Sequence, residues 1–333
     1  MKLAMYWQRI KGDQIHCYLC PHNCLIPQGG TGRCRVRQNR GGELLSLNYG
    51  VLSGIALDPM EKKPLYHFCP GSLVLSVGSR GCNLACGFCQ NWTSVQGEVP
   101  LQTISVGELV QLAEASRPRG NCGVAFTYTE PLMWYEFVQE AAALIQQRGM
   151  GTVLVTNGFI EPEPWQQLLP NIDAVNIDLK AFTPEFYRKN CGGRLKPVQA
   201  AIAGAVGKCH VEITTLLIEG HNTDPKEIEE LSAFLADLDP DIPLHLSRYY
   251  PAKAWRQPAT DPDLIQKLAA IARQRLNYVY TGNLPDSWQA ETRCPQCNGL
   301  LVKRGLEVRV NLAQGHCPYC QHPANIQLNC TKE

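Results

Sequence analysis

The sequence lacks both a long apolar run and an excess of charge of either sign. No stretch approaches the roughly 18 consecutive apolar residues that a membrane-spanning helix needs. The formal net charge is +1, so no global field favours nucleic acid, an anionic membrane or an acidic partner. Residues 1–10, MKLAMYWQRI, also lack the uninterrupted apolar segment of a signal peptide. We therefore expect a soluble, cytoplasmic protein.

Cysteine, in contrast, is abundant, with 16 residues in a chain of 333. Disulfides do not persist in a reducing cytosol, so clustered cysteines there indicate metal ligands. Eleven of them form three sets, which are Cys17, Cys20, Cys24 and Cys34; Cys82, Cys86 and Cys89; and Cys294, Cys297, Cys317 and Cys320. The other five are scattered, and we interpret them as small buried apolar residues: Cys69, Cys122, Cys191, Cys209 and Cys330.

Strand-like apolar segments alternate with helical patterns through the middle of the chain. Helices are predicted over 131–148 and 261–274, and after capping boxes at Ser105–Glu108 and Asp224–Glu227. Repeated strand–helix units predict an α/β fold with a parallel sheet. Six units are fewer than the eight of a closed barrel, so we predict a partial (β/α)6 TIM-like barrel. Its predicted strands, rich in Val, Ile and Leu, are 72–79, 123–128, 152–157, 173–179, 210–218 and 243–249.

The two ends of the chain differ in composition from this central part. Residues 1–50 are rich in Cys, Gly, Arg and Gln, and residues 289–333 contain two short Cys-Pro-x-Cys turns around a strand-like segment. Each end is too small to bury a large core and needs metal for stability. We therefore divide the chain into a Cys-rich N-terminal metal-binding extension (1–50), a partial barrel (51–288) and a four-Cys lobe of zinc-ribbon or rubredoxin type (289–333).

Polar residues follow four consecutive predicted strands. The functional edge of a parallel α/β sheet lies at the carboxyl ends of its strands. The residues at this edge are Cys82–Cys89, Tyr128–Glu130, Thr156–Gly158 and Asp178–Lys180. Because all four groups share one edge, the sequence predicts that they form a single site.

Cys82, Cys86 and Cys89 have the spacing C-x3-C-x2-C directly after the first of these strands. A four-iron cluster normally takes four thiolates. Three thiolates leave one iron with an open coordination position, which can bind the amine and carboxylate of a substrate. Structural zinc sites need four ligands, and an x3 spacing is unusual for them. We therefore predict a [4Fe–4S] cluster, with a zinc knuckle or buried free thiols as the alternatives.

With Phe88 just before its last cysteine, this motif resembles that of the radical SAM superfamily. Further stretches resemble the pyruvate formate-lyase activating enzyme branch and, more closely, the radical SAM enzyme of the AmmeMemoRadiSam system. The stretches are 17–24, 58–71, 89–92, 126–131, 156–159, 176–180 and 245–251. The resemblance covers nearly the whole chain. It implies reductive cleavage of S-adenosylmethionine (SAM) to a 5′-deoxyadenosyl radical, which abstracts hydrogen from a substrate that the sequence does not identify.

The resemblance also implies which residues lie beside SAM. Phe88 corresponds to a residue near the adenine, and Glu130 to an acid that holds the amino group. The glycines that usually precede this acid are absent, so a hydroxyl of Tyr128 or Thr129 could contribute instead. The full set, in which His245 is a candidate on the substrate side, is Phe88, Tyr128, Thr129, Glu130, Thr156, Asn157, Asp178, Lys180 and His245.

Each of these positions also has a purely structural interpretation. Glu130 precedes Pro131 and is placed to cap a helix, and Asn157-Gly158 fits a simple turn. Asp178 and Lys180 project on the same side of a strand and could form only an ion pair. A lone histidine on a strand, such as His245, is often satisfied within the core.

The two flanking cysteine sets have four possible ligands each, so neither leaves an open coordination position on a single metal ion. Cys294, Cys297, Cys317 and Cys320 have the spacing of a zinc ribbon or of a rubredoxin-like iron site, and we favour zinc. Cys17, Cys20, Cys24 and Cys34 have the spacing C-x2-C-x3-C-x9-C. This spacing suits either zinc, which we favour here too, or an auxiliary iron–sulfur cluster.

Three functions remain open from the sequence. The first is a radical SAM enzyme that acts on a small-molecule or protein substrate and receives electrons from a donor such as flavodoxin or ferredoxin. The second is an activase of a glycyl-radical enzyme, and the third is a non-catalytic zinc-ribbon adaptor. The AmmeMemoRadiSam resemblance adds AMMECR1-like and Memo-like proteins as possible partners. Neither a membrane nor a nucleic-acid partner is indicated.

Overall fold

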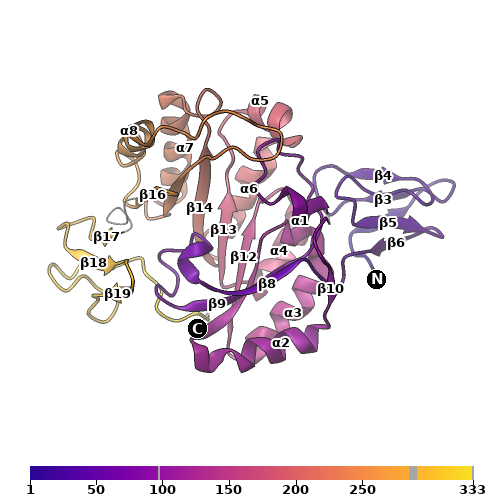
Figure 1. Ribbon diagram of the computed structural model, residues 1–333, viewed down its shortest axis with the longest axis horizontal. Helices are drawn as coiled ribbons and strands as arrows, with labels where there is room; N and C mark the ends of the chain where they lie inside the picture. The colour runs from indigo at the N-terminus through magenta and orange to yellow at the C-terminus, as the bar shows by residue number, and fades with distance from the viewer. Residues whose placement is uncertain (97, 285–290, 332–333) are drawn as a thin grey trace.

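The computed structural model describes residues 1–96, 98–284 and 291–331. Its centre is one eight-stranded sheet with the order β16-β15-β14-β13-β12-β11-β9-β8 (Figure 1). Seven strands are parallel, and β8 at one edge is antiparallel to β9. The strands are Gly54–Pro59 (β8), Leu73–Gly78 (β9), Asn121–Phe126 (β11), Gly151–Thr156 (β12), Ala174–Asp178 (β13), His210–Leu217 (β14), Leu244–Arg248 (β15) and Val279–Gly282 (β16).

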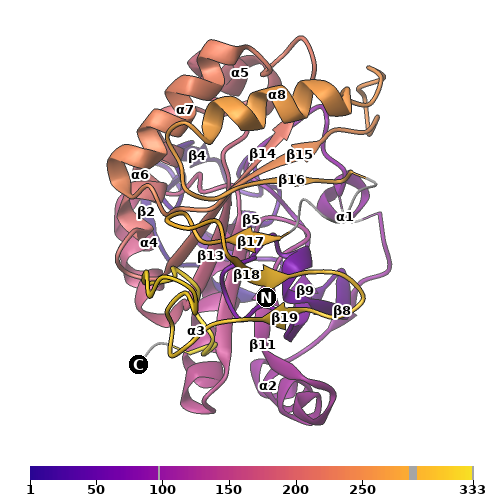
Figure 2. The same cartoon turned by 90° about the vertical axis from the view of Figure 1, so that its left-hand side faces the viewer.

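Helices follow the strands and cover the outer side of the sheet (Figure 2). The longer ones are Val106–Ala115 (α2), Tyr135–Gln147 (α3), Pro162–Leu168 (α4), Leu195–Ala205 (α6), Pro225–Leu238 (α7) and Pro262–Ala272 (α8). Short helical segments are Trp92–Gln96 (α1), Pro184–Phe186 (α5), the 3-10 turns Met60–Lys62 (η1), Arg117–Arg119 (η2), Pro131–Trp134 (η3) and Leu169–Asn171 (η4), and the π-turn Tyr187–Cys191 (η5). Within the described ranges, no helix has the length and apolar character needed to cross a membrane.

All six predicted strands are present, with ends that differ by one or two residues. The six predicted strand–helix units are present, and the structure adds two strands to them: β16 is a seventh parallel strand after α8, and β8 extends the opposite edge. Both are hard to recognise from sequence, since β16 has only four residues and β8 is largely half-exposed. No pairing joins β16 to β8 in the described part of the chain, so the sheet is open, as expected of a partial barrel.

The predicted helix starts are confirmed fully at one position and partly at another. Ser105 caps α2 in a complete capping box with Glu108. Asp224 caps α7 by accepting from the Lys226 amide, but Glu227 does not complete the box. The Glu227 carboxylate instead accepts a hydrogen bond of 2.6 Å from the amide of Phe182. The start of α7 is therefore tied to the loop that follows β13.

Two small lobes lie on opposite sides of the sheet (Figure 1). The N-terminal lobe contains the sheets β1-β6-β5 and β2-β3-β4, and the C-terminal lobe contains β17-β18-β19, while β7 pairs with β10. The boundary expected at residues 288–289 falls outside the described residues. The strands are Lys2–Leu3 (β1), Trp7–Arg9 (β2), Ile15–Cys17 (β3), Cys24–Ile26 (β4), Arg37–Arg40 (β5), Glu43–Ser46 (β6), Val51–Leu52 (β7), Gln102–Thr103 (β10), Thr292–Arg293 (β17), Leu300–Lys303 (β18) and Arg309–Val310 (β19).

A disulfide between Cys69 and Cys330 fastens the C-terminal tail to the sheet. Our interpretation of these two cysteines as unpaired apolar residues is therefore wrong. The two positions are separated by 261 residues, and only the fold brings them together. An isolated parallel β-bridge between Phe68 and Gln327 joins the same two segments.

Replacing Cys330 with serine is expected to lower the free energy of unfolding by about 3 kcal/mol, because the disulfide restricts the unfolded chain over a long loop. Chemical denaturation with and without a thiol reductant measures this, and the difference between variant and wild type should vanish under reduction. Cys122→Ser is the matched control, since Cys122 is a free half-buried thiol next to the same apolar cluster. An equal loss in both variants would contradict the prediction.

Candidate active site

The central cysteine triplet lies on the loop after β9, at the carboxyl edge of the sheet. All three thiols are free; Cys86 is buried, and Cys82 and Cys89 are half-buried. Backbone hydrogen bonds hold this loop in place, with the Ala85 amide donating to the carbonyl of Cys191 (2.8 Å) and the Gly87 amide to that of Asn190 (3.3 Å). The loop is thus clamped by the π-turn that follows β13.

The donor set of this loop fits an iron–sulfur cluster. Three thiols without disulfide partners face the edge of the sheet, and they do not form a tight single-ion group among the described residues. A four-iron cluster bonds each thiolate to a different iron and so keeps the sulfurs further apart than one ion does. Burial raises the pKa of the Cys82 thiol well above its usual value. A buried thiol of this kind becomes a thiolate when a metal displaces its proton.

Glu130 is a buried carboxylate that follows β11, and it is fully hydrogen-bonded. Its Oε1 accepts from Thr156 Oγ1 (2.6 Å) and from the Leu132 amide (3.0 Å), and its Oε2 accepts from the Asn157 amide (2.8 Å). The contact to Leu132 makes it the N-cap of η3, so the structural interpretation of Glu130 is confirmed. Burial raises its pKa to about 7, against the opposing effect of these hydrogen bonds. A carboxylate in such surroundings gains strongly from a bound cation.

Asn157 connects the end of β12 to the cysteine loop. Its Nδ2 lies 3.6 Å from Cys82 Sγ and donates to Asn83 Oδ1 at 2.9 Å. Its Oδ1 accepts from the Phe159 amide at 2.8 Å, which fixes the turn after the strand. The structure therefore brings Thr156, Asn157 and Glu130 together beside Cys82, as the sequence predicts for one edge of the sheet.

Asp178 and Lys180 form an ion pair of 2.6 Å at the end of β13. Burial alone would lower the pKa of Lys180, but the negative charges of Asp178 and Cys86 raise it above its usual value. The ion pair that the structural interpretation expects is thus present. The pair also places a permanent positive charge near the thiols of Cys86 and Cys89.

Phe88 is buried against aromatic residues from two later loops. Its ring centroid lies 5.7 Å from that of Phe186 and 5.1 Å from that of Trp255. A side chain at Gly87 would collide with the Trp255 indole, so glycine is required for this close approach. Lys253 Nζ donates to the Cys86 carbonyl (2.9 Å), which ties the loop after β15 to the cysteine loop.

Trp255, Lys253 and Cys191 were missed in the sequence. Cys191 is buried, and its thiol lies within hydrogen-bond reach of Cys86. All three lie on loops far from the triplet in sequence, with no periodicity that predicts their position. A Trp and a Lys within a single loop after a predicted strand are the only signal that could have drawn attention to them.

The structure directs Tyr128 away from the cysteine loop. Its hydroxyl donates to Asp58 Oδ2 on β8 (2.6 Å), and Lys63 Nζ lies 4.8 Å from its ring centroid. Its backbone has a φ of 67°, a left-handed conformation that turns the chain sharply after β11. Thr129, the next residue, is half-buried, and its backbone amide donates a hydrogen bond to the Thr127 carbonyl.

His245 is not brought to the cysteine loop, so its placement at the functional edge is wrong. It is the second residue of β15, and β15 is followed by β16 rather than being the last strand. Its Nε2 lies 2.6 Å from the buried carboxylate of Glu212, which also binds His210. The ring packs against Tyr66 and Tyr280. Its role is therefore that of a satisfied core histidine.

The C-terminal cysteine set forms a compact four-thiol group. The sulfurs of Cys294, Cys297, Cys317 and Cys320 all lie within 4.8 Å of one another, and two pairs are 3.6 Å apart. A tetrahedral ion with metal–sulfur bonds of about 2.3 Å places its sulfurs about 3.8 Å apart. The arrangement therefore fits one metal ion and does not distinguish zinc from iron.

Replacing Cys317 with serine is expected to remove about one metal ion per chain and to unfold the C-terminal lobe, because so small a core depends on its metal. Elemental analysis measures the metal and its identity, and limited proteolysis measures the exposure of the lobe. Cys209→Ser, at a half-buried thiol outside the three sets, is the control. An unchanged metal content in Cys317→Ser would refute a four-thiol site.

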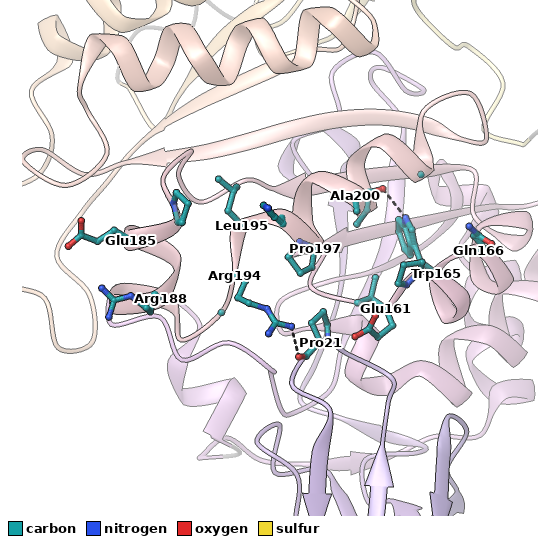
Figure 3. A pocket seen from close by; sticks show the side chains of 17 residues that line it. Pro21, Glu161, Trp165, Gln166, Glu185, Arg188, Arg194, Leu195, Pro197 and Ala200 are labelled. Carbon is teal, nitrogen blue, oxygen red and sulfur yellow. Dashed lines mark hydrogen bonds between the residues drawn. The ribbon is translucent and has the colours of Figure 1, made fainter.

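A separate hollow of about 780 Å³ lies outside the sheet between the N-terminal lobe, α4 and α6 (Figure 3). Arg194 closes one side by donating to the Pro21 carbonyl (2.7 Å), and the Trp165 indole donates to the Ala201 carbonyl (2.9 Å). None of the predicted SAM-binding residues lines it. The hollow therefore marks where the N-terminal lobe meets the helices and is distinct from the cysteine loop.

Comparison with known proteins identifies the family. Residues 76–235 match the model of the radical SAM superfamily, a range that contains the cysteine loop, Glu130, Asn157 and Lys180. This part of the chain is a radical SAM domain. Such a domain implies a [4Fe–4S] cluster and SAM, and the free thiols of the loop fit such a cluster.

Three individual proteins are also similar to this chain in sequence or in structure. An uncharacterized protein, MJ0808 of Methanocaldococcus jannaschii, is 35% identical over 341 residues, which covers 98% of this chain and all of its own. A 4-hydroxyphenylacetate decarboxylase activating enzyme of Clostridioides difficile is 24% identical over 136 residues, 39% of this chain and 43% of its own. The crystal structure of Streptococcus suis SuiB bound to S-adenosylmethionine has a TM-score of 0.50 at 14% identity, covering 60% of this chain and 48% of that one. SuiB shares the fold.

Proposed function

We propose that this protein cleaves SAM reductively at the Cys82–Cys89 loop and uses the resulting radical to abstract hydrogen from a substrate. The observation that carries the proposal is the convergence of Glu130, Asn157 and the Asp178–Lys180 pair beside the three free thiols. These groups come from the ends of three neighbouring strands, where the fold places functional residues. A bound cluster would supply the electron that breaks the sulfonium bond of SAM.

Glu130 acts as the hydrogen-bond acceptor for the amino group of SAM. Its carboxylate is held rigidly by Thr156 Oγ1 and by two backbone amides, so little reorganisation is needed on binding. Asn157 orients Cys82 through its Nδ2 and fixes the adjacent turn through its Oδ1. Together these residues place the methionine end of SAM against the open side of the cysteine loop.

Phe88, Trp255 and the Asp178–Lys180 pair serve the rest of SAM and the substrate. The two aromatic rings form an apolar wall for the adenine and exclude water from the reacting centre. Lys180 compensates the negative charge of the thiolates, and Asp178, which is partly exposed, is available to the ribose or to the substrate. The cofactors supply the radical chemistry, and the protein supplies orientation and protection.

Anaerobic reconstitution with iron and sulfide, followed by reduction in the presence of SAM, tests the proposal. The expected result is 5′-deoxyadenosine together with an electron paramagnetic resonance signal that changes when SAM is added. Protein that contains its cluster and is fully reduced, yet forms no 5′-deoxyadenosine, would refute it.

A second candidate is an activase that acts on a partner protein. The similarity to a curated activating enzyme and the resemblance of the motifs to the pyruvate formate-lyase activating enzyme branch support it. The two extra Cys-rich lobes and the resemblance to the AmmeMemoRadiSam system favour a different substrate. Capture of a partner that acquires a glycyl-radical doublet in electron paramagnetic resonance would decide for the activase. For both candidates we propose flavodoxin or ferredoxin as the electron donor and Memo-like proteins as partners.

A further inference from the structure

The N-terminal cysteine set forms one group inside its lobe. Cys17 on β3 lies directly opposite Cys24 on β4, and Cys20 and Cys34 lie on the adjoining turns. Cys17, Cys20 and Cys34 are buried, and Cys24 is half-buried. The thiols are close enough for their charges to interact across the set. Four mostly buried thiols in one small lobe form a built ligand set.

The spacing of these sulfurs differs from that of the C-terminal set. There, four sulfurs lie within 4.8 Å of one another, as one tetrahedral ion requires. Among the residues that the structure describes, Cys17, Cys20, Cys24 and Cys34 form no such group. Neither does the Cys82–Cys89 triplet, to which membership of the family assigns a four-iron cluster. Like the cluster-binding loop, the N-terminal set therefore lacks the compact arrangement of a single-ion site among the described residues.

A buried cationic side chain, Arg37, lies beside the N-terminal cysteine set. Arg37 lies beside Cys17 and Cys34 and is paired with Glu136 of α3. Its Nε is buried and has no hydrogen-bond partner within the described residues. An orphaned charged donor at this depth costs free energy unless an acceptor faces it. Thiolate or inorganic sulfide in the lobe would provide that acceptor.

The N-terminal set directly adjoins the central loop, because both residues that flank Cys82 contact it. The carbonyl of Asn83 lies 2.7 Å from His22 Nε2, and the Asn83 side chain reaches the Cys20 thiol. On the other side, a Cβ at Gly81 would lie 3.0 Å from the carbonyl oxygen of Cys34. One residue on each side therefore separates the two sets of thiols.

We infer that Cys17, Cys20, Cys24 and Cys34 hold a second iron–sulfur cluster, which relays electrons to the Cys82–Cys89 site. One electron enters from a reduced flavodoxin- or ferredoxin-class protein, which is oxidised by one electron, and the second cluster is reduced by one. The same electron then passes to the central cluster, and no bond is formed or broken. Because electron tunnelling falls off exponentially with distance, the contact of the N-terminal lobe with the residues that flank Cys82 makes this step fast. The relay rests on the proposed function, whereas the second cluster does not.

Metal analysis of the full-length protein tests the second cluster. After anaerobic reconstitution, a Cys82→Ala/Cys86→Ala/Cys89→Ala variant is expected to retain about four iron atoms and four sulfides per chain, against about eight of each in the wild type. Its reduced state should give an electron paramagnetic resonance signal that does not respond to SAM. A variant that holds extra zinc and no iron would overturn the inference. Retained iron in this variant supports the second cluster even if the wild type forms no 5′-deoxyadenosine.

The relay is tested in a Cys17→Ala/Cys20→Ala variant, with Cys209→Ala as a matched control for loss of a thiol outside the sets. The variant should keep its SAM-responsive signal, which shows that the central site is folded and loaded. Reduction of that site by reduced flavodoxin in stopped flow is expected to slow by about tenfold or more, with no change in the control. Equal rates in variant and wild type would overturn the relay. Loss of the SAM-responsive signal in the variant would also count against it, since the two sites would then not be separate.

Discussion

Replacing Cys86 with alanine is expected to lower 5′-deoxyadenosine formation by about a thousandfold or more, which corresponds to a loss of about 4 kcal/mol of transition-state stabilisation. Cys86 is the most deeply buried thiol of the triplet, and its neighbours Cys191 and Lys180 surround it. Two remaining thiolates do not hold a four-iron cluster on the loop. The measurement is chromatographic detection of 5′-deoxyadenosine, together with iron analysis of the same sample.

The control for this experiment is Cys209→Ala, which removes a thiol outside the three sets. Circular dichroism of both variants shows whether the sheet is intact. Retention of the SAM-responsive signal in Cys86→Ala would mean that Cys191 takes its place as a ligand, because the Cys191 thiol lies within hydrogen-bond reach of Cys86. Retention of both signal and activity would contradict the assignment of Cys86 to the cluster.

SAM is expected to bind more tightly above pH 7 than below it, and the Glu130→Gln variant is expected to lose this dependence. Burial raises the pKa of Glu130 to about 7, so its carboxylate is charged above that pH and becomes neutral below it. The charged form is the stronger acceptor for the N–H groups of the SAM amino group. The affinity should therefore fall by up to about tenfold for each pH unit below 7, whereas a carboxyl with an ordinary pKa would stay charged until about pH 4.3.

Isothermal titration of the reconstituted protein at about pH 6 and about pH 8 measures this effect. Glu130→Gln keeps the shape of the side chain but not its charge, so its SAM affinity should be weak at both values. Glu114→Gln, at a partly exposed glutamate of α2 that pairs with Arg148, is the matched control and should behave as the wild type. An equal SAM affinity of the wild type at the two pH values would show that Glu130 does not receive the amino group.

The group of residues at the carboxyl ends of the strands was predictable, because the strand ends depend on local sequence patterns. Strand-like runs of Val, Ile and Leu ended at Thr156 and Asp178, and parallel strands necessarily place such ends together. The positions of Glu130, Asn157 and the Asp178–Lys180 pair followed from this rule. His245 did not follow it, because it is the second residue of β15, near the start of the strand, and Glu212 binds its imidazole inside the core.

Contacts between distant loops could not be predicted in this way. Trp255 reaches Phe88, and Cys191 reaches Cys86, through loops whose paths depend on the packing of the whole sheet. The pairing of Cys69 with Cys330 across 261 residues is of the same kind. A pattern of residue types along the chain holds no information about which loops meet, because that is decided by many weak contacts acting together.

The sequence by itself determined the α/β class, the strand ends and the division of the cysteines into three sets. It did so because strand periodicity and ligand spacing are local properties. Only the tertiary structure decided that the C-terminal set alone forms a compact four-thiol group among the described residues, and that the N-terminal lobe contacts the residues that flank Cys82. The distance between sulfurs is set by how loops pack, and that packing is settled only when the chain has folded.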